Sequence, residues 1–269
     1  MPSELGKIGI FLRRDFAMLS TYRFAFVTNT LSKFFIFFWI VLIGKIFGQT
    51  SSILSPYGGN FISFVLVGAI GWSLLWNTID AMIFSLRNEM LMGTIEAIFL
   101  TPTSKVIIML AYGIFGFVFG MISVISFFLV GLFAFDINIF AAANLYTLAI
   151  FILSCTTATG VGLILCGLTF WQKYLGQFVP FLQGIAVFFS EVYFPTAVLP
   201  SYLQPLSQIV PFYYSIKGIR LSLLGIPTTE LTQCILVLFI LTIVFFMIGF
   251  FTLDKCIAKA KRDGTLSFY

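Results

Sequence analysis

Six stretches of the sequence are apolar over about 20 residues or more and carry few charged side chains. A helix rises about 1.5 Å per residue, so about 20 apolar residues are enough to cross the hydrocarbon layer of a membrane. The sequence therefore predicts a single-domain, all-α polytopic membrane protein with six transmembrane helices. These cover residues 24–47, 60–84, 106–135, 144–170, 175–194 and 231–253.

The composition agrees with a membrane protein and excludes several chemistries. Apolar residues make up 60% of the chain and charged residues 9%, whereas an ordinary globular domain has roughly 25% charged residues. The chain has no histidine, so every Ser-His, Cys-His or His-metal centre is excluded. Its four cysteines show no C-x-x-C spacing, which argues against a zinc site or a disulfide framework. No catalytic, cofactor-binding or metal-binding residue is predicted.

The basic residues predict the topology. Eleven of the 15 Lys and Arg lie in the terminal segments and the second-to-third and fourth-to-fifth loops, and three lie in the other loops. Because cytoplasmic loops are enriched in Lys and Arg, we expect both termini in the cytoplasm, including the tail 254–269. The first apolar run is too long for a cleavable signal and should stay as an anchor. The net charge of +5 indicates topology and membrane lipids as partners rather than nucleic acid.

Residues 1–23 carry an apolar stripe with helical spacing, and their cations lie off that stripe. The stripe contains Leu5, Ile8, Leu12, Phe16 and Leu19, and the cations are Lys7, Arg13 and Arg14. This pattern predicts a helix in the membrane interface with its cations toward anionic headgroups. It fits a simple anchor, and it also fits an anchor that contacts a cytosolic partner.

A second amphipathic segment lies between the second and third spans. If residues 87–103 form one helix, Glu89 and Glu96 are seven residues apart and share a face. Thr101-Pro102 should end this helix, because proline disfavours helical geometry in the residue before it. The physical pattern fits a surface filler and a docking element for a soluble protein equally well.

Residues 195–230 are too apolar for a solvated loop and too often interrupted for a spanning helix. We expect short helices that re-enter the outer leaflet, where irregular backbone must be shielded by protein or water. The segment is a candidate external gate, and a lid that only packs the outer surface is the alternative. The prolines that interrupt this region are Pro195, Pro200, Pro205, Pro211 and Pro227.

Polar and small residues inside the spans give weaker signals. Lys33 lies about nine residues, or roughly 14 Å, into the first span, where it either faces a substrate path or extends back to the interface. Asp80 lies near the inner end of the second span, and no acid lies clearly at mid-membrane, which argues against a proton-coupled carrier. Gly116 and Gly120 belong to a small-residue pattern that allows close helix packing within the subunit or lines a substrate path.

Two motifs resemble those of one transporter family. Gly93-Thr94-Ile95-Glu96, followed by Thr101-Pro102, resembles the Gly-Thr-Leu-Glu…Thr-Pro signature of type-2 ATP-binding-cassette (ABC) exporter permeases. Phe194-Pro195…Leu199-Pro200…Pro211…Arg220 is similar to the external segment of the same family, and more to its drug-exporter branch than to its polysaccharide branch. With six spans, an interfacial N-terminal helix and cytoplasmic ends, the resemblance covers essentially the whole chain.

The resemblance implies that the second-to-third loop is a coupling helix that docks on a separate nucleotide-binding subunit. Two permeases, identical or related, would work with two ATPase subunits, which bind ATP and Mg²⁺, in a prokaryotic cell membrane. This chain would be non-catalytic and bind no cofactor; it also lacks the G-x-x-x-x-G-K-[S/T] sequence that cradles ATP. The implied coupling positions, with the first two added from the helical wheel, are Arg87, Glu89, Gly93, Thr94, Glu96, Thr101 and Pro102. The implied gate positions are Glu191, Phe194, Pro195, Pro200, Pro211, Lys217 and Arg220.

The sequence departs from the family pattern at two positions. Glu191 stands where a small residue, often glycine, is usual, and Lys217 stands where an acid is frequent. Because a charge near hydrocarbon is costly unless paired or hydrated, we hypothesise that Glu191 pairs with Lys217 or Arg220. The expected function is ATP-driven export of a drug, lipid, glycolipid or polysaccharide. The alternative is a self-sufficient secondary carrier or channel.

Overall fold

A computed structural model describes residues 4–21, 23–47, 52–172, 175, 177–225 and 229–264. The described residues form helices and turns and no β-strand. The helices are α1 (Glu4–Thr21), α2 (Arg23–Phe47), η1 (Ser52–Tyr57), α3 (Phe61–Leu91), α4 (Ile95–Leu100), α5 (Lys105–Phe135), α6 (Leu145–Gln172), α7 (Phe178–Phe189), η2 (Thr196–Val198), α8 (Gln204–Ile209), α9 (Pro211–Leu223) and α10 (Thr229–Arg262).

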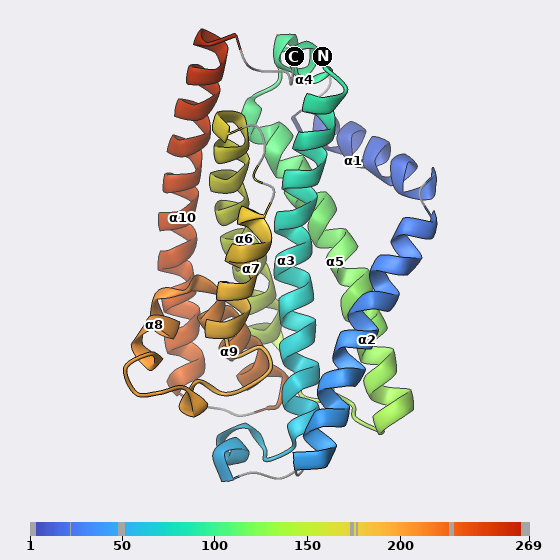
Figure 1. Cartoon of the computed structure of the whole chain (residues 1–269), viewed down its shortest axis with the longest axis vertical. Helices are drawn as coiled ribbons and strands as arrows, with labels where there is room; N and C mark the ends of the chain where they lie inside the picture. The colour runs from blue at the N-terminus through green and yellow to red at the C-terminus, as the bar shows by residue number, and fades with distance from the viewer. Residues whose placement is uncertain are drawn as a thin grey trace.

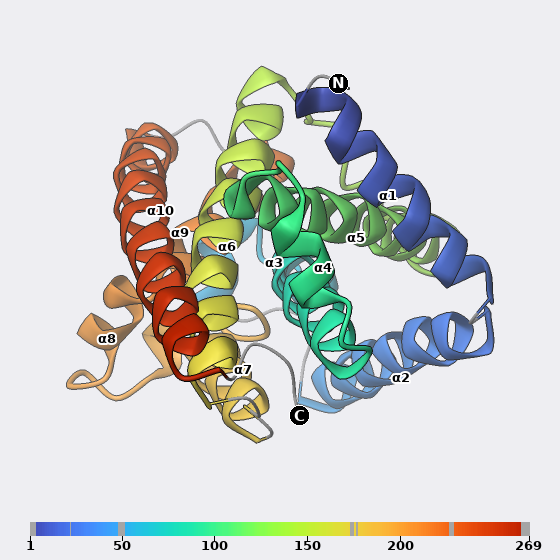
Figure 2. The same ribbon diagram turned by 90° about the horizontal axis from the view of Figure 1, so that it is seen from above.

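The long helices run side by side along the molecule, with α3 at the centre (Figures 1 and 2). The most apolar 18 residues of α3 are all buried, whereas 17% of the corresponding stretch of α10 is buried. α5 and α6 pack on α3, and α10 packs along the outer side of α6. The core of the protein is therefore built around α3, and the outer helices leave large apolar surfaces exposed.

Small residues allow these helices to approach closely. A Cβ added at Gly116 in α5 would lie 2.7 Å from the backbone oxygen of Asn77 in α3. A Cβ added at Gly160 in α6 would lie 2.9 Å from the backbone of Phe245 in α10. Such distances leave room only for hydrogen, so these glycines serve packing within the subunit, which is one of the two uses expected for small residues in the spans.

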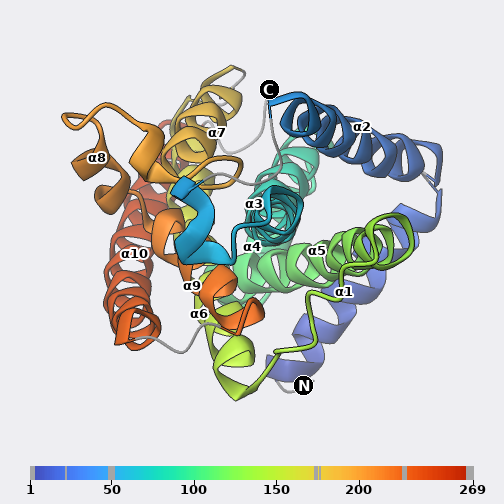
Figure 3. The ribbon, with the colours of Figure 1, turned by 90° about the horizontal axis from the view of Figure 1, so that it is seen from below.

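The molecule has two distinct ends. The first is the α4 end, which holds α4, the start of α1 and the last turns of α10 (Figure 1). The second is the η1 end, where η1 lies over α9 when the molecule is seen along its axis (Figure 3). α1 lies across the long helices rather than along them. Both ends of the described chain thus lie at the same end of the molecule.

The all-α polytopic fold is confirmed. Among the described residues, four helices are long and apolar enough to cross a membrane: α3, α5, α6 and α10. α2 matches the first predicted span in its bounds, and its crossing stays a prediction. The fifth span was predicted over residues 175–194, but α7, the helix in this region, has only 12 residues. A helix of that length rises about 18 Å, less than the roughly 30 Å of the hydrocarbon layer.

The single helix predicted over residues 87–103 is also corrected. α3 continues to Leu91, Gly93 adopts a left-handed φ of 70°, and α4 starts only at Ile95. A left-handed residue cannot continue a right-handed helix, so Glu89 and Glu96 belong to different helices and do not share a face. Glu89 is buried and Glu96 is exposed.

The proline-interrupted segment forms the short helices that were expected. Pro195 precedes η2, Pro205 lies at the start of α8 and Pro211 is the first residue of α9. Proline fits the first turn of a helix because the amide hydrogens there have no partner within the helix. α9 is largely buried against α3, α6 and α10. Whether these helices enter the membrane stays a prediction.

Candidate functional sites

α4 presents an exposed surface on a firmly held segment. Ile95 is fully buried and anchors the helix, whereas the Leu100 side chain is 88% exposed. Met92 is 62% exposed in the turn that precedes α4, and Glu96 is exposed on its first turn. We call Leu91, Met92, Glu96 and Leu100 the α4 knob, an apolar surface with one carboxylate.

The turns on both sides of α4 are fixed by local contacts. Before α4, Thr94 bonds through its hydroxyl to the carboxylate of Glu89. After α4, the Thr101 hydroxyl donates to the carbonyl of Ile98 at 2.7 Å, and Thr101 itself is extended with ψ of 152°. That conformation is the one that the following Pro102 requires. α4 is therefore held at both ends.

Two cations of α1 contact the segment around α4. The Arg14 guanidinium lies 2.5 Å from the Glu89 carboxylate and 2.8 Å from Asp15. Lys7 donates from its Nζ to the backbone oxygen of Pro102 at 2.9 Å. The expectation that Lys7 and Arg14 point to lipid headgroups is therefore wrong, because both contact the segment around α4, while Arg13 is exposed.

Two buried carboxylates, those of Asp15 and Glu89, explain why the Arg14 side chain points into the protein. Asp15 is 4% exposed and Glu89 is 8% exposed, and a buried carboxylate is strongly destabilising without a cation. Burial raises the pKa of Asp15 although Arg14 opposes the shift, and the charge of Glu89 raises it further. Glu89 therefore contacts α1 rather than solvent, while Arg87 is exposed on the last turns of α3.

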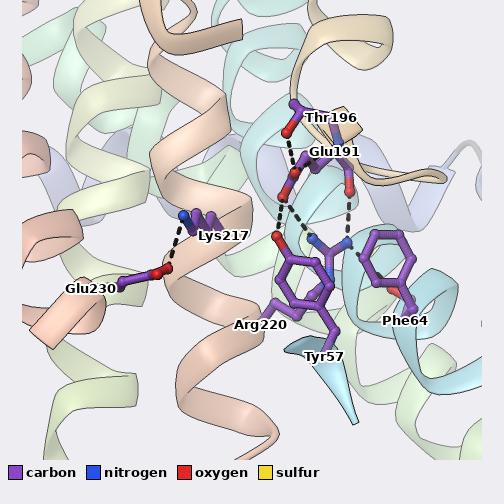
Figure 4. A network of polar contacts seen from close by, with 7 residues as sticks. All are labelled: Tyr57, Phe64, Glu191, Thr196, Lys217, Arg220 and Glu230. Atoms are coloured by element: carbon purple, nitrogen blue, oxygen red, sulfur yellow. Dashed lines mark hydrogen bonds and ion pairs between the residues drawn. The ribbon is translucent and has the colours of Figure 1, made fainter. Parts of the chain in front are cut away.

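At the η1 end, Glu191 and Arg220 form a buried ion pair (Figure 4). Arg220 Nη1 lies 3.6 Å from Glu191 Oε2, and the two side chains are 0% and 1% exposed. Glu191 Oε1 accepts from the amide and hydroxyl of Thr196 at 2.8 and 2.6 Å. The Tyr57 hydroxyl donates to Oε2 at 3.1 Å. Burial and the charge of Glu191 raise the pKa of Tyr57, so this phenol keeps the proton that it donates.

Arg220 also ties the pair to the central helix. Its Nη2 donates to the backbone oxygens of Glu191 at 2.6 Å and of Phe64 at 3.4 Å. The guanidinium carbon lies 3.6 Å from the centre of the Phe64 ring. A Cβ added at Gly68 of α3 would lie 1.9 Å from the Val192 oxygen and 3.0 Å from Arg220. Sequence reasoning missed Gly68, whose only signal was a glycine within an apolar run.

The structure selects one of the two hypothesised pairs. Glu191 pairs with Arg220, whereas Lys217 pairs with Glu230 at 3.0 Å (Figure 4). Phe194 contacts Phe188 through an edge-to-face ring pair at 5.4 Å. Pro200 is exposed, Pro195 precedes η2 and Pro211 is the first residue of α9. None of the three joins the side-chain contacts of the ion pair. Of the predicted gate residues, Glu191 and Arg220 thus form the buried ion pair, and Lys217 forms a separate, partly exposed pair with Glu230.

A cavity of about 510 Å³ lies between α2, α3, α5 and α7. Trp72 and Trp76 line it and stack on one another with ring centres 5.3 Å apart. Asn77 and Gln183 contribute amides to this lining, and Asp80 contributes a carboxylate. Sequence reasoning missed this cavity because its walls come from four separate elements. Lys33 lies in α2, but its side chain is outside the described residues.

The described residues contain no group of three or more His, Cys, Asp or Glu that could hold a metal ion. What they form is a bundle of long apolar helices, a half-open cavity lined by aromatic, polar and small residues, and different polar contacts at the two ends. The fold is that of a polytopic membrane protein.

The chain belongs to the ABC-2 type transporter family, whose sequence model matches residues 7–224. No individual curated protein matches it. The protein is accordingly a multi-pass membrane permease component of an ABC transporter. Permeases of this family are generally non-catalytic and associate with an ATP-binding subunit.

Proposed function

We propose that the chain is the permease subunit of an ATP-driven exporter in a prokaryotic cell membrane. Two permease copies, identical or related, work with two ATP-binding subunits that carry ATP and Mg²⁺. The α4 knob faces the cytoplasm and docks on the ATP-binding subunit. The observation that carries this proposal is the 88% exposure of Leu100 on a helix whose two flanking turns are fixed.

The connections of α4 to its neighbours suggest how a movement of α4 reaches the rest of the permease. α4 joins α3 through Gly93 and α5 through Thr101-Pro102, and α3 and α5 reach the opposite end of the molecule (Figure 1). Arg14 and Lys7 connect the same segment to α1. An ATP-binding subunit that contacts the knob differently in two states would bias the permease between inward-facing and outward-facing arrangements.

The Glu191–Arg220 pair serves as the external gate contact in this scheme. It joins η1, the turn after α7, α9 and the first turns of α3. Because a buried ion pair is costly to separate, these segments move as one unit when the η1 end opens. Lys217 and Glu230 connect α9 to the start of α10 beside this unit.

The cavity between α2, α3, α5 and α7 is the proposed substrate site. Stacked Trp72 and Trp76 provide apolar area, and Asn77 and Gln183 provide hydrogen-bonding groups. Such walls suit an amphipathic or hydrophobic compound such as a drug, lipid or glycolipid. Lys33 is a further candidate for the substrate path.

Transport by reconstituted liposomes tests the function. We expect ATP-dependent movement of an amphipathic dye only when the chain is reconstituted with its ATP-binding subunit. A secondary carrier would instead transport without that subunit under an ion gradient, and this result would contradict the proposal.

The substrate site has its own matched variants. Gln183→Leu should raise the KM for transport by about two- to tenfold, because one neutral hydrogen bond contributes roughly 0.5–1.5 kcal/mol. Gln177→Leu, at the exposed start of α7 and outside the cavity, should leave the KM unchanged. If both variants changed the KM equally, the cavity would not be the substrate site.

A further inference from the structure

A second cavity, of about 250 Å³, lies at the α4 end, where α10 passes the turn between α4 and α5. The turn between α4 and α5 and the start of α5 contribute the polar residues Thr103, Ser104 and Lys105. α10 contributes the apolar Phe250 and Leu253 and the charged Asp254 and Lys261. We propose that this cavity binds the phosphate headgroup of an anionic phospholipid, with an acyl chain along the α10 side.

The charges of the cavity favour an anion. Lys105 lies 2.8 Å from Asp254, so one of the two lysines is already neutralised within the cavity. The Lys261 ammonium lies 5.7 Å from the Phe99 ring, and none of the described carboxylates forms an ion pair with it. Two cations and one carboxylate leave a net positive charge beside two hydroxyl groups. The start of the 31-residue α5 at Lys105 adds its positive dipole end.

The apolar residues of the cavity favour a lipid over a free phosphate ion. Phe250 is 50% exposed and belongs to α10, one of the helices able to cross a membrane. A free phosphate gains nothing from this surface, whereas an acyl chain can cover it. The lining of the cavity thus combines cations with apolar side chains, and basic pockets of this kind between helices recognise anionic headgroups.

Neighbouring residues place the cavity at the level of the membrane interface. The Lys259 ammonium lies 5.1 Å from the Trp171 ring, and the Lys255 ammonium lies 4.1 Å from the Phe251 ring. Tryptophan is enriched at the membrane interface, where a helix leaves the hydrocarbon layer, so Trp171 beside Lys259 fits this level. A headgroup at this level can reach Lys261 while its acyl chains remain in the bilayer.

The position of the cavity gives the lipid a role in coupling, and this part rests on the proposed function. Phe99 of α4 and Thr103 of the following turn form part of the cavity wall. A bound headgroup therefore contacts the segment that carries the α4 knob. Occupancy should hold α4 in place and increase ATP hydrolysis by the assembled transporter.

Lipid retention by the purified full chain tests the binding site without the ATP-binding subunit. Native mass spectrometry of the protein with phosphatidylglycerol or phosphatidylcholine would measure binding for wild type, Lys261→Gln and Lys105→Gln. Lys255→Gln and Lys259→Gln are matched controls, because they remove the same charge from α10 outside the cavity. Asp254→Asn removes the one carboxylate found among the described residues that line the cavity.

We expect phosphatidylglycerol to bind at least tenfold more tightly than phosphatidylcholine. Lys261→Gln should weaken phosphatidylglycerol binding about tenfold, the control variants should change it less than twofold, and Asp254→Asn should strengthen it. Equal losses in the controls would indicate diffuse surface attraction and overturn the proposal. Inorganic phosphate that competes as well as phosphatidylglycerol would also overturn it, because the acyl chain would then contribute nothing. Failure of the exporter proposal would leave these binding results unaffected.

Discussion

At the scale of single residues, Glu191 combines an unfavourable backbone with unusually many side-chain contacts. Its φ of 55° lies in the left-handed region that favours glycine, which is the residue often found at this position in the resembling permeases. Its carboxylate accepts from Thr196 and Tyr57 and pairs with Arg220. These contacts offset the backbone strain, and they explain how an acid can replace a small residue here.

Glu191→Gln should destabilise the protein by about 3–5 kcal/mol, because it leaves the buried Arg220 without a counter-charge. Thermal unfolding of the detergent-purified chain measures this loss. The double variant Glu191→Gln with Arg220→Met is the control and should lose less, since no buried charge remains unpaired. A Glu191→Gln variant that transports normally and is as stable as wild type would show that the pair contributes nothing.

Asp15 provides a pH-dependent prediction. Its pKa in the folded protein is raised above the usual value of 3.8, so the folded state binds its proton more tightly than the unfolded state. The resulting stabilisation is present at acid pH and is lost as the pH rises through the raised pKa. The stability of wild type relative to Asp15→Asn should therefore increase from about pH 8 to about pH 4. A difference that is constant with pH would contradict the raised pKa.

At the scale of elements, Gly93 separates α3 from α4. The glycine has φ of 70°, and a Cβ at this position would meet no atom within 4 Å. Its role is therefore conformational rather than steric. Because Gly93 lets α3 stop and α4 turn away, the α4 knob becomes an exposed feature instead of the continuation of a long helix.

Gly93→Ala should cost about 1–2 kcal/mol from the left-handed backbone alone. We expect lower ATP hydrolysis in the assembled transporter, with substrate affinity unchanged, because the cavity residues lie elsewhere. Gly9→Ala is the matched control: Gly9 also has open space around a Cβ but does not have a left-handed φ. If both variants behave alike, the special conformation of Gly93 has no role in coupling.

The elements also show what sequence patterns could and could not predict. Long apolar runs predicted four of the spans because hydrophobicity is a local property, and prolines predicted the breaks before η2 and α9. The end of α7 was missed because Ser190 and Glu191 are not typical helix breakers. The contacts of Arg14 with Glu89 and of Lys7 with Pro102 join residues far apart in the chain. No local periodicity can reveal such pairs, and the helical wheel assigned both cations to lipid.

At the scale of the whole molecule, α3 connects the two polar sites. Glu89 near one end of α3 contacts α1, and the backbone of Phe64 near the other end accepts from Arg220. Trp72 and Trp76 line the large cavity between these ends. α3 therefore leads into the knob, lines the cavity and contacts the ion pair. This is the arrangement expected if docking at α4 controls access at the η1 end.

The most direct measurement is photo-crosslinking in cells from benzoylphenylalanine placed at position 100, with identification of the adducts by mass spectrometry. Leu100 is 88% exposed at the α4 end, and Tyr202 provides a control that is 76% exposed between η2 and α8. The predicted adduct from position 100 is a soluble protein with a phosphate-binding G-x-x-x-x-G-K-[S/T] loop, and position 202 should give none. Adducts with such a protein from position 202 alone, or only with lipids from position 100, would contradict docking at α4.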